Sequence, residues 1–252
     1  MSDDLTYPGG KLRLFVEAPL AAGAQVEIEA GQAHYLLHVM RARPGDRLSL
    51  FNGRDGEWLA EVAQIAKRSC TLACTVQMAP QGEVPDLWLV FAPVKKTPAD
   101  YLTQKATELG VRALQPVITR RTIVSRVNTE RMRANAVEAA EQSGRVSVPE
   151  IHEPLAFDKL LASWPAERRI LFCDEGGDCP PIADALHAAR SQSPSCWAVF
   201  IGPEGGVDPA ERAALRAMAH VTAVSLGSRI LRADTAALAA LAVWQSVCGD
   251  WK

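Results

Sequence analysis

The sequence predicts an α/β protein with two domains, a small β-barrel over residues 1–78 and a parallel sheet covered by helices over residues 79–252. Short, often alternating apolar runs fill the first part, whereas longer apolar runs alternate with helical patterns from Leu87 onward. Between them, residues 79–85 carry two prolines and a glycine, which disfavour continuing either a strand or a helix. This stretch therefore marks the expected linker.

The N-terminal part is expected to form strands at five short runs. Turn signals at Asn52-Gly53 and Asp55-Gly56 separate some of them. A helical insert is expected at about residues 32–41, before the turn Pro44-Gly45-Asp46. The five runs are LRLFVE, QVEIEA, DRLSLFN, GEWLAEV and CTLACTV.

The C-terminal part is expected to alternate strands with helices. Helices are predicted near residues 99–109, 129–143, from about 210 onward and over 235–247. Repeated β-then-α alternation favours a parallel sheet with helices on both faces, and ligands of such sheets bind in loops beyond the carboxyl ends of the strands. The strand-like runs are LWLVFA, VRALQPVI, RRILFC, CWAVFI and VTAVSL.

Composition limits the function classes. The start has acids where a secretory signal needs positive charge, and no apolar stretch approaches about 18 residues, so we expect a cytoplasmic protein without a membrane partner. The six cysteines form no C-x-x-C pair, and the five histidines complete no usual zinc spacing. His34 and His38 have i, i+4 spacing but no evident third ligand, which favours an RNA contact or packing. We therefore expect no metal.

Positive charge concentrates in the middle of the chain. Residues 95–145 carry 10 Lys and Arg against 5 Asp and Glu, although the formal net charge of the chain is -2. A polyanion is expected to bind across this segment. The alternative is a helix face with solvated arginines.

The first candidate ligand loop is Gly202-Pro203-Glu204-Gly205-Gly206, which directly follows the strand 196–201. Its glycines leave the backbone bare, so that a ligand can touch N–H and C=O groups. Asp208 and Pro209 then form a favourable N-cap and first-turn pair. The loop is neither a P-loop nor a dinucleotide-binding turn, and read alone it could be an ordinary strand-to-helix turn.

The second candidate loop, residues 226–237, places two arginines around an apolar pair before a helix. Ile230 and Leu231 are suited to flank an adenine ring, and Arg232 to meet an anionic substrate. The alternative places the arginines in solvent and the apolar pair in the core.

Together the two loops resemble the signature of the SPOUT superfamily of RNA methyltransferases. The motifs at 104–111, 141–145, 201–206 and 226–232 resemble, in order, those of the bacterial 16S rRNA uridine N3-methyltransferases (RsmE-like). Residues 34–36, 39–41 and 45–46 are similar to the PUA-like RNA-binding domain of that family. The resemblance spans nearly the whole chain.

The resemblance implies a C-terminal SPOUT-type domain with a trefoil knot, an N-terminal PUA-like β-barrel, S-adenosyl-L-methionine as cofactor and a homodimer. The implied reaction is methylation of uridine N3 in 16S rRNA, either free or in the small ribosomal subunit. An alternative is a SPOUT enzyme that acts on another position, such as a ribose 2′-OH of transfer RNA. The order of the motifs and the N-terminal domain argue against it. An RNA-binding protein without catalysis is weighed against by the two intact loops.

Uracil N3 carries a proton at neutral pH, so the enzyme must help to remove it or stabilise the developing anion. We hypothesise that Arg232 stabilises this anion or fixes a nearby phosphate, and that Glu204 assists proton removal. The expected cofactor-binding residues are Phe172, Ile201, Gly202, Pro203, Glu204, Gly205, Gly206, Leu226, Gly227, Ser228, Ile230, Leu231, Arg232 and Thr235. The expected RNA-binding residues are Arg13, His34, Arg41, Lys95, Lys96, Arg120, Arg121, Arg126 and Arg145.

Overall fold

A computed structural model describes residues 12–66, 69–124, 126–176, 178–190 and 196–251, with the side chains of residues 96 and 97 left out. The described chain divides into two units. The first runs to Glu83 and includes Ala140–Val148, and the second comprises Val84–Ala139 and the residues from Pro149 onward. The division between Glu83 and Val84 falls inside the stretch that sequence reasoning marks as a linker.

The first unit contains a five-stranded sheet in the order β1-β3-β4-β5-β2. Only the β1–β3 pair is parallel, and the other neighbours are antiparallel. The predicted strand runs all appear in this sheet, with apolar side chains such as Leu50 and Leu72 fully buried between its strands and the helical insert. The strands are β1 (Arg13–Phe15), β2 (Gln25–Glu27), β3 (Arg47–Phe51), β4 (Glu57–Ile65) and β5 (Cys70–Ala79).

The helical insert of this unit has an unexpected geometry. Helix α1 (Ala30–His34) continues directly as a π-helix, η1 (Tyr35–Val39). Arg41 then adopts a positive φ of 56°, which is unusual for a residue other than glycine. The prediction of a helix at this position is confirmed, but the spacing of apolar residues does not distinguish a π-helix from an α-helix.

The second unit contains a parallel sheet in the order β12-β10-β11-β6-β7-β8, with β9 also paired to β7. The predicted parallel sheet is therefore confirmed. Its strands are β6 (Leu87–Phe91), β7 (Ala113–Ile118), β8 (Glu150–Ile151), β9 (Leu155–Ala156), β10 (Arg169–Cys173), β11 (Trp197–Ile201) and β12 (Val221–Val224).

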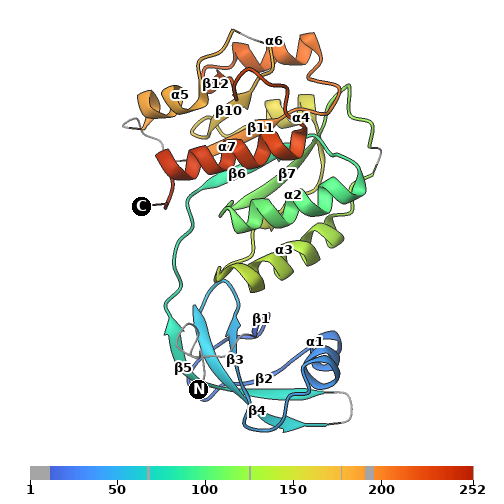
Figure 1. The fold of residues 1–252 in the computed structure, drawn as a ribbon, viewed down its shortest axis with the longest axis vertical. Helices are drawn as coiled ribbons and strands as arrows, with labels where there is room; N and C mark the ends of the chain where they lie inside the picture. The colour runs from blue at the N-terminus through green and yellow to red at the C-terminus, as the bar shows by residue number, and fades with distance from the viewer. Residues whose placement is uncertain (1–11, 67–68, 125, 177, 191–195, 252) are drawn as a thin grey trace. The chain divides into compact units, whose positions relative to one another are not determined.

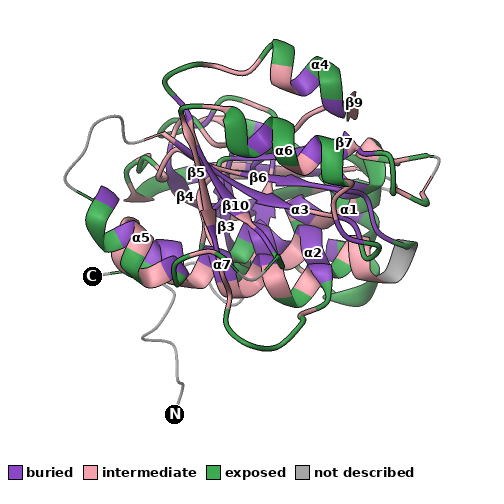
Figure 2. Cartoon of the chain, turned by 90° about the horizontal axis from the view of Figure 1, so that it is seen from above, coloured by how far each residue is buried: buried purple, intermediate pink, exposed green. Residues whose placement is uncertain are grey.

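Helices cover both faces of this sheet (Figures 1 and 2). One buried cluster joins the sheet to α2, α3, α5 and α7, and a second cluster joins the opposite face to α4 and α6. The central strands β6, β7, β10 and β11 are mainly buried because they lie between these helical layers, as Figure 2 shows. The helices are α2 (Lys96–Glu108), α3 (Thr129–Ser143), α4 (Phe157–Ala162), α5 (Ile182–Ala189), α6 (Pro209–Ala217) and α7 (Ala233–Val247).

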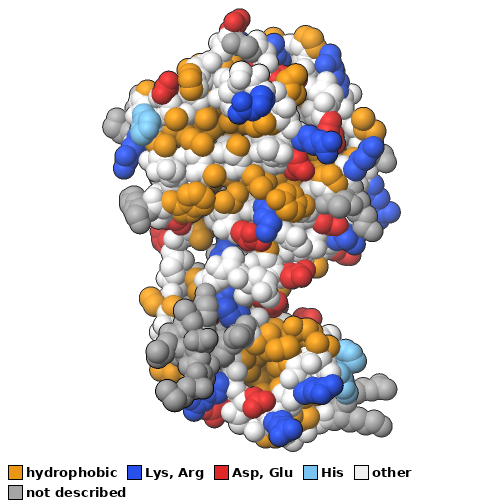
Figure 3. All heavy atoms as spheres, in the orientation of Figure 1, with side chains coloured by type: hydrophobic (Ala, Val, Ile, Leu, Met, Phe, Trp, Pro, Cys, Tyr) orange, Lys and Arg blue, Asp and Glu red, His pale blue; other side chains and the backbone are white. Residues whose placement is uncertain are grey.

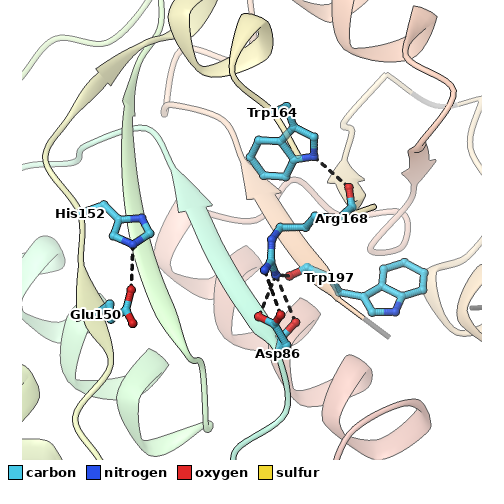
Figure 4. A network of polar contacts seen from close by, with 6 residues as sticks. All are labelled: Asp86, Glu150, His152, Trp164, Arg168 and Trp197. Atoms are coloured by element: carbon cyan, nitrogen blue, oxygen red, sulfur yellow. Dashed lines mark hydrogen bonds and ion pairs between the residues drawn. The ribbon is translucent and has the colours of Figure 1, made fainter. Parts of the chain in front are cut away.

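The amino ends of the central strands are joined by Arg168, which precedes β10 (Figure 4). Its guanidinium donates to both carboxylate oxygens of Asp86, at 2.9 and 3.0 Å, and to the carbonyl of Trp197 at 3.1 Å. It also lies 4.0 Å from the ring centroid of Trp88. These contacts hold β6, β10 and β11 in register at the end of the sheet opposite the candidate ligand loops.

Candidate active site

A cavity of about 700 Å³ lies at the carboxyl ends of the adjacent strands β10, β11 and β12. Three loops and the start of α7 form its walls, which is where a parallel sheet is expected to bind a ligand. Its lining residues are Phe172, Cys173, Asp174, Glu175, Ile201, Gly202, Pro203, Glu204, Gly206, Val207, Arg212, Ser225, Leu226, Gly227, Ser228, Arg229, Ile230, Leu231, Arg232, Ala233 and Ala236.

The structure brings the two motif loops together around this one cavity. Most of the residues expected to hold the cofactor line it, and Phe172 does so from the core, where its ring packs against Phe200 with centroids 5.7 Å apart. Gly205 and Thr235 do not line it, although each lies next to a residue that does. The expected residues that line the cavity are Phe172, Ile201, Gly202, Pro203, Glu204, Gly206, Leu226, Gly227, Ser228, Ile230, Leu231 and Arg232.

The first loop is a tight turn closed by a hydrogen bond of 2.9 Å from the amide of Gly206 to the carbonyl of Pro203. Gly206 has a φ of +72°, and a Cβ there would collide with Oε1 of Glu175. The predicted N-cap is present, because the side chain of Asp208 accepts from the amide of Ala210 at 3.0 Å. The positive φ favours glycine at 206, and a larger residue would also have to displace the flexible end of the Glu175 side chain.

The second loop presents exposed side chains to the cavity. Ile230 is 88% exposed, and Arg229 and Arg232 are exposed on either side of it. Arg232 is also the N-cap residue of α7, and its carbonyl accepts from the amide of Ala236 at 2.8 Å. Glu204 on the first loop is exposed as well, so both proposed catalytic side chains border the cavity and remain accessible to a substrate.

Sequence reasoning missed a buried ion cluster at the end of β10. The side chain of Asp174 is 2% exposed, and its Oδ2 lies 2.8 Å from Nε of Arg212 and 2.8 Å from Nε of Arg216. Burial alone raises the pKa of Asp174, but hydrogen bonds from Arg212, the Gly176 amide and Arg216 outweigh it and hold this pKa below its ordinary value. A charged carboxylate thereby fixes Arg212 against the cavity wall.

The position of Asp174 in the sequence, directly after a predicted strand, could have indicated this cluster. Asp174 and Glu175 directly follow the strand run RRILFC, and residues after such strands face the ligand end of the sheet. The neighbouring Cys173 also lines the cavity, and burial raises the pKa of its thiol to about 12. The thiol is therefore neutral at pH 7 and unsuited to act as a nucleophile.

Two of the arginines predicted to bind RNA are engaged beside the first loop. Arg120 pairs with Asp208, with Nη1 and Oδ1 3.3 Å apart, and Arg121 donates from Nη1 to the carbonyl of Gly205 at 3.0 Å. Both side chains stay exposed, as does that of Arg126. Lys95 is exposed at the N-cap of α2, and the side chain of Lys96 lies outside the described part of the chain.

The structure contradicts the expectation that Arg13 contacts RNA, because its side chain is buried. Its side chain is 5% exposed and forms a bidentate pair with Glu57, at 3.0 and 3.1 Å. Its remaining N–H groups donate to the carbonyls of Ala140, Glu141 and Arg145, so that all five guanidinium donors are used within the first unit. Arg13 is therefore a structural residue that ties the end of α3 to β1 and β4.

The other predicted RNA contacts of the first unit differ in exposure. His34 and Arg41 are exposed at the helical insert, where the rings of His34 and His38 lie 4.7 Å apart. Arg145 is half-buried and donates from Nε to Oγ of Ser147 at 3.3 Å. No cluster of three or more His, Cys, Asp or Glu side chains that could hold a metal occurs among the described residues. Within that same part, no helix is long and apolar enough to span a membrane.

Comparison with known proteins agrees with this arrangement. Residues 81–245 match the RNA methyltransferase domain family, and residues 28–73 match the RNA methyltransferase PUA domain. The chain is 32% identical to ribosomal RNA small subunit methyltransferase E of Rickettsia conorii, over 91% of this chain and 93% of the relative. It is 34% identical to the protein of the same name from Synechocystis sp., over 91% of this chain and 76% of the relative.

A solved structure has the same fold. The crystal structure of ribosomal RNA small subunit methyltransferase E from Neisseria gonorrhoeae, bound to S-adenosyl methionine, aligns with a TM-score of 0.86 and 28% identity. The alignment covers 96% of this chain and 99% of that one. These findings confirm the family expected from the motifs. The chain belongs to the RNA methyltransferase family, and its N-terminal unit carries the PUA domain of such enzymes.

Proposed function

We propose that this protein transfers the methyl group of S-adenosylmethionine to N3 of a uridine in the 16S rRNA of the small ribosomal subunit. The observation that carries the proposal is the single cavity into which both motif loops converge, with Arg232 and Glu204 at its border. The relatives named ribosomal RNA small subunit methyltransferase E support the substrate class. A ribosomal substrate would place the enzyme in the cytoplasm.

The cavity suits S-adenosylmethionine in size and chemistry. Its volume of about 700 Å³ falls in the range of pockets that bury small organic ligands. Bare backbone at Gly202 offers hydrogen-bonding groups to an adenine edge, and Leu226 and Leu231 offer apolar surface to its ring. Arg212 offers a cation to a carboxylate, because Asp174 holds it at the wall. The S-adenosyl methionine bound to the Neisseria gonorrhoeae protein supports the same cofactor here.

The bound cofactor supplies an activated methyl group, so the protein must position uracil and manage the proton on N3. In the proposed mechanism the guanidinium of Arg232 stabilises negative charge as it develops on the uracil ring. The Glu204 carboxylate accepts the N3 proton, directly or through a water molecule. Both side chains are exposed beside the cavity and can therefore reach a base that enters from solvent.

We include the trefoil knot in this proposal. Strand β11 lies between β10 and β6, and β12 returns to the far side of β10. The chain thus inserts a strand between two that precede it in sequence. This order supports a C-terminal segment threaded through an earlier loop, and it places the end of β12 next to the loops after β10 and β11.

A homodimer is also part of the proposal. Hydrophobic side chains gather over α7 and the adjoining elements on the face seen in Figure 3, and Leu238, Val243 and Val247 of this helix are only partly buried. Such a surface favours a partner. Light scattering after size-exclusion chromatography is expected to give twice the mass of the chain at micromolar concentration. A monomer alone would remove the dimer from the account without affecting the cofactor site.

The test of the proposed reaction is methyl transfer from radiolabelled S-adenosylmethionine to small ribosomal subunits that lack this modification. The wild-type protein should label the 16S rRNA, and Arg232→Ala should lower kcat by about 100-fold or more, because one preorganised charge-stabilising group is lost. Cofactor affinity, measured by calorimetry, separates a catalytic effect from a binding effect. Labelling by Arg232→Ala at the wild-type rate would remove Arg232 from the mechanism.

A further inference from the structure

The turn Thr119–Thr122, hereafter the arginine turn, follows β7 and lies outside both motif loops, yet it is bonded to the first turn of α6. The amide of Arg120 donates to Oε1 of Glu211 at 2.9 Å, and its guanidinium pairs with Asp208 at 3.3 Å. The turn is also closed on itself, since Oγ1 of Thr122 accepts from the amide of Thr119 at 2.9 Å. Its backbone is thus fixed both internally and to α6.

A second connection joins the arginine turn to the Gly202–Gly206 loop. Nη1 of Arg121 donates to the carbonyl of Gly205 at 3.0 Å. The same atom lies 3.9 Å from the position that a Cβ on Gly206 would occupy, beside the carboxylate of Glu175. Since Glu204 and Gly206 both line the cavity, the guanidinium of Arg121 lies next to its wall.

Glu211 lies in the first turn of α6, where an acidic residue is favoured, but its burial there is uncommon for a carboxylate. It is 4% exposed, and its Oε2 atom has no hydrogen-bond partner among the described residues. Burying a carboxylate oxygen without a hydrogen-bond partner costs free energy, so the burial of Glu211 calls for an explanation. Here the other oxygen, Oε1, holds the amide of Arg120 across 91 residues of sequence.

Arg121 is equipped to bind an anion. Its side chain is exposed, and the bond to Gly205 is the one hydrogen bond found for it among the described residues. A guanidinium has five N–H donors, so Arg121 retains donors that can take a phosphate oxygen pair.

We infer that Glu211 is a positioning residue that holds the arginine turn on the Gly202–Gly206 loop, so that Arg121 binds an RNA phosphate beside the cavity and this binding is coupled to that of the methyl donor. The inference rests on the proposed function and adds a link between its two substrates. A ligand in the cavity that orders the Gly202–Gly206 loop also fixes the carbonyl of Gly205. Because this carbonyl accepts from Arg121, the ligand thereby orients the Arg121 side chain. Thermodynamic linkage makes the effect reciprocal, so that bound RNA strengthens cofactor binding to the same degree.

The test compares three variants with the wild type, using small ribosomal subunits as the RNA substrate. Glu211→Ala is expected to raise the KM for subunits about tenfold, the equivalent of one weakened charge-assisted contact. Glu211→Gln keeps an acceptor for the amide of Arg120 and should restore a KM within about twofold of wild type. Arg121→Ala should match Glu211→Ala, and the double variant should be no worse than Arg121→Ala.

Cofactor linkage is measured on the same proteins. S-adenosylhomocysteine should tighten binding of subunits to the wild type and should do so far less in Glu211→Ala. Additive effects of the two substitutions, or equal tightening in Glu211→Ala, would overturn the inference while leaving the proposed function standing. Absence of any cofactor binding to the wild type would instead defeat the proposed function.

Glu211→Ala leaves the partly buried amide of Arg120 unpaired and removes a buried side chain, which lowers stability, so a measurement on the wild type is included. Hydrogen exchange of the Arg120 amide is expected to slow when S-adenosylhomocysteine is added, because the turn is fixed to the loop that the ligand orders. Unchanged exchange at Arg120, with slower exchange in the Gly202–Gly206 loop, would show that the two segments move independently and would contradict the coupling.

Discussion

Oδ2 of Asp174 lies 2.8 Å from Nε of Arg212, and both residues line the cavity. The carboxylate is almost fully buried, whereas the side chain of Arg212 is 33% exposed. The buried acid therefore fixes the orientation of a cation that faces the ligand. This relationship joins the stability of the second unit to the chemistry of its site.

The substitution Asp174→Asn tests that relationship. It removes the charge that Arg212 and Arg216 share, and we expect the free energy of unfolding to fall by about 2–3 kcal/mol. The dissociation constant of S-adenosylmethionine should rise as well, because Arg212 loses its anchor. Urea unfolding and calorimetry measure the two effects. Asp178→Asn, which alters an exposed acid nearby, is the matched control, and unchanged cofactor affinity in Asp174→Asn would contradict the assigned role.

The lowered pKa of Asp174 predicts a pH dependence of stability. The folded protein binds this proton more weakly than the unfolded chain, whose Asp pKa is about 3.9, so the stabilisation is fully present above that value. It is lost as the pH falls through the lower pKa of the folded state. The difference in unfolding free energy between wild type and Asp174→Asn should thus be constant from about pH 5 to 8 and shrink below about pH 4. A difference that grew toward low pH would have the wrong sign.

Two adjacent glycines of the first loop should respond differently to alanine. Gly206 has a φ of +72°, where a Cβ is strained by about 1–2 kcal/mol and would also displace the carboxylate of Glu175. A Cβ on Gly205 would meet nothing closer than Cβ of Arg121 at 3.8 Å. We expect the loop of Gly206→Ala to relieve this strain by leaving the conformation that lines the cavity, which would weaken cofactor binding by about 5- to 30-fold, the equivalent of 1–2 kcal/mol. Gly205→Ala serves as the control within the same loop, and equal effects of the two substitutions would contradict this account.

Arg13 is expected to affect stability. Replacing it with alanine leaves the carboxylate of Glu57, whose side chain is 11% exposed, without its partner, and should cost about 3–5 kcal/mol. The matched control is Arg47→Ala, which breaks a pair with Glu61 of similar length, 2.9 Å, but with both side chains well exposed. That loss should stay below about 1 kcal/mol. Urea unfolding measures both losses. An Arg13→Ala variant as stable as Arg47→Ala would contradict the structural role of Arg13.

Much of the fold follows from local patterns. The sequence predicts α3 from about Thr129 to Ser143, and the helix spans these residues, because the helix-forming run ends at Gly144. The N-cap at Asp208 was likewise readable, since a capping side chain and a first-turn proline act within a few residues. The short strands β8 and β9, of two residues each, carry no periodicity and were not foreseen.

Long-range pairing explains the remaining differences. Residues 140–148 belong with the first unit because Arg13 binds carbonyls more than a hundred positions away, which no local pattern reveals. Because these partners are distant in sequence, the local pattern around Arg13 favours a surface cation. For the site, bare backbone and apolar pairs identified both loops, whereas the role of Arg212 depends on α6 packing beside the end of β10.

The chemical identity of the methylated nucleoside decides whether this protein methylates N3 of uridine. Small ribosomal subunits lacking the modification are incubated with the protein and isotopically labelled S-adenosylmethionine, and the digested 16S rRNA is separated by liquid chromatography and mass spectrometry. The label should appear in 3-methyluridine. Label in a 2′-O-methylated nucleoside or in another base, or an unlabelled 16S rRNA despite bound cofactor, would contradict the account.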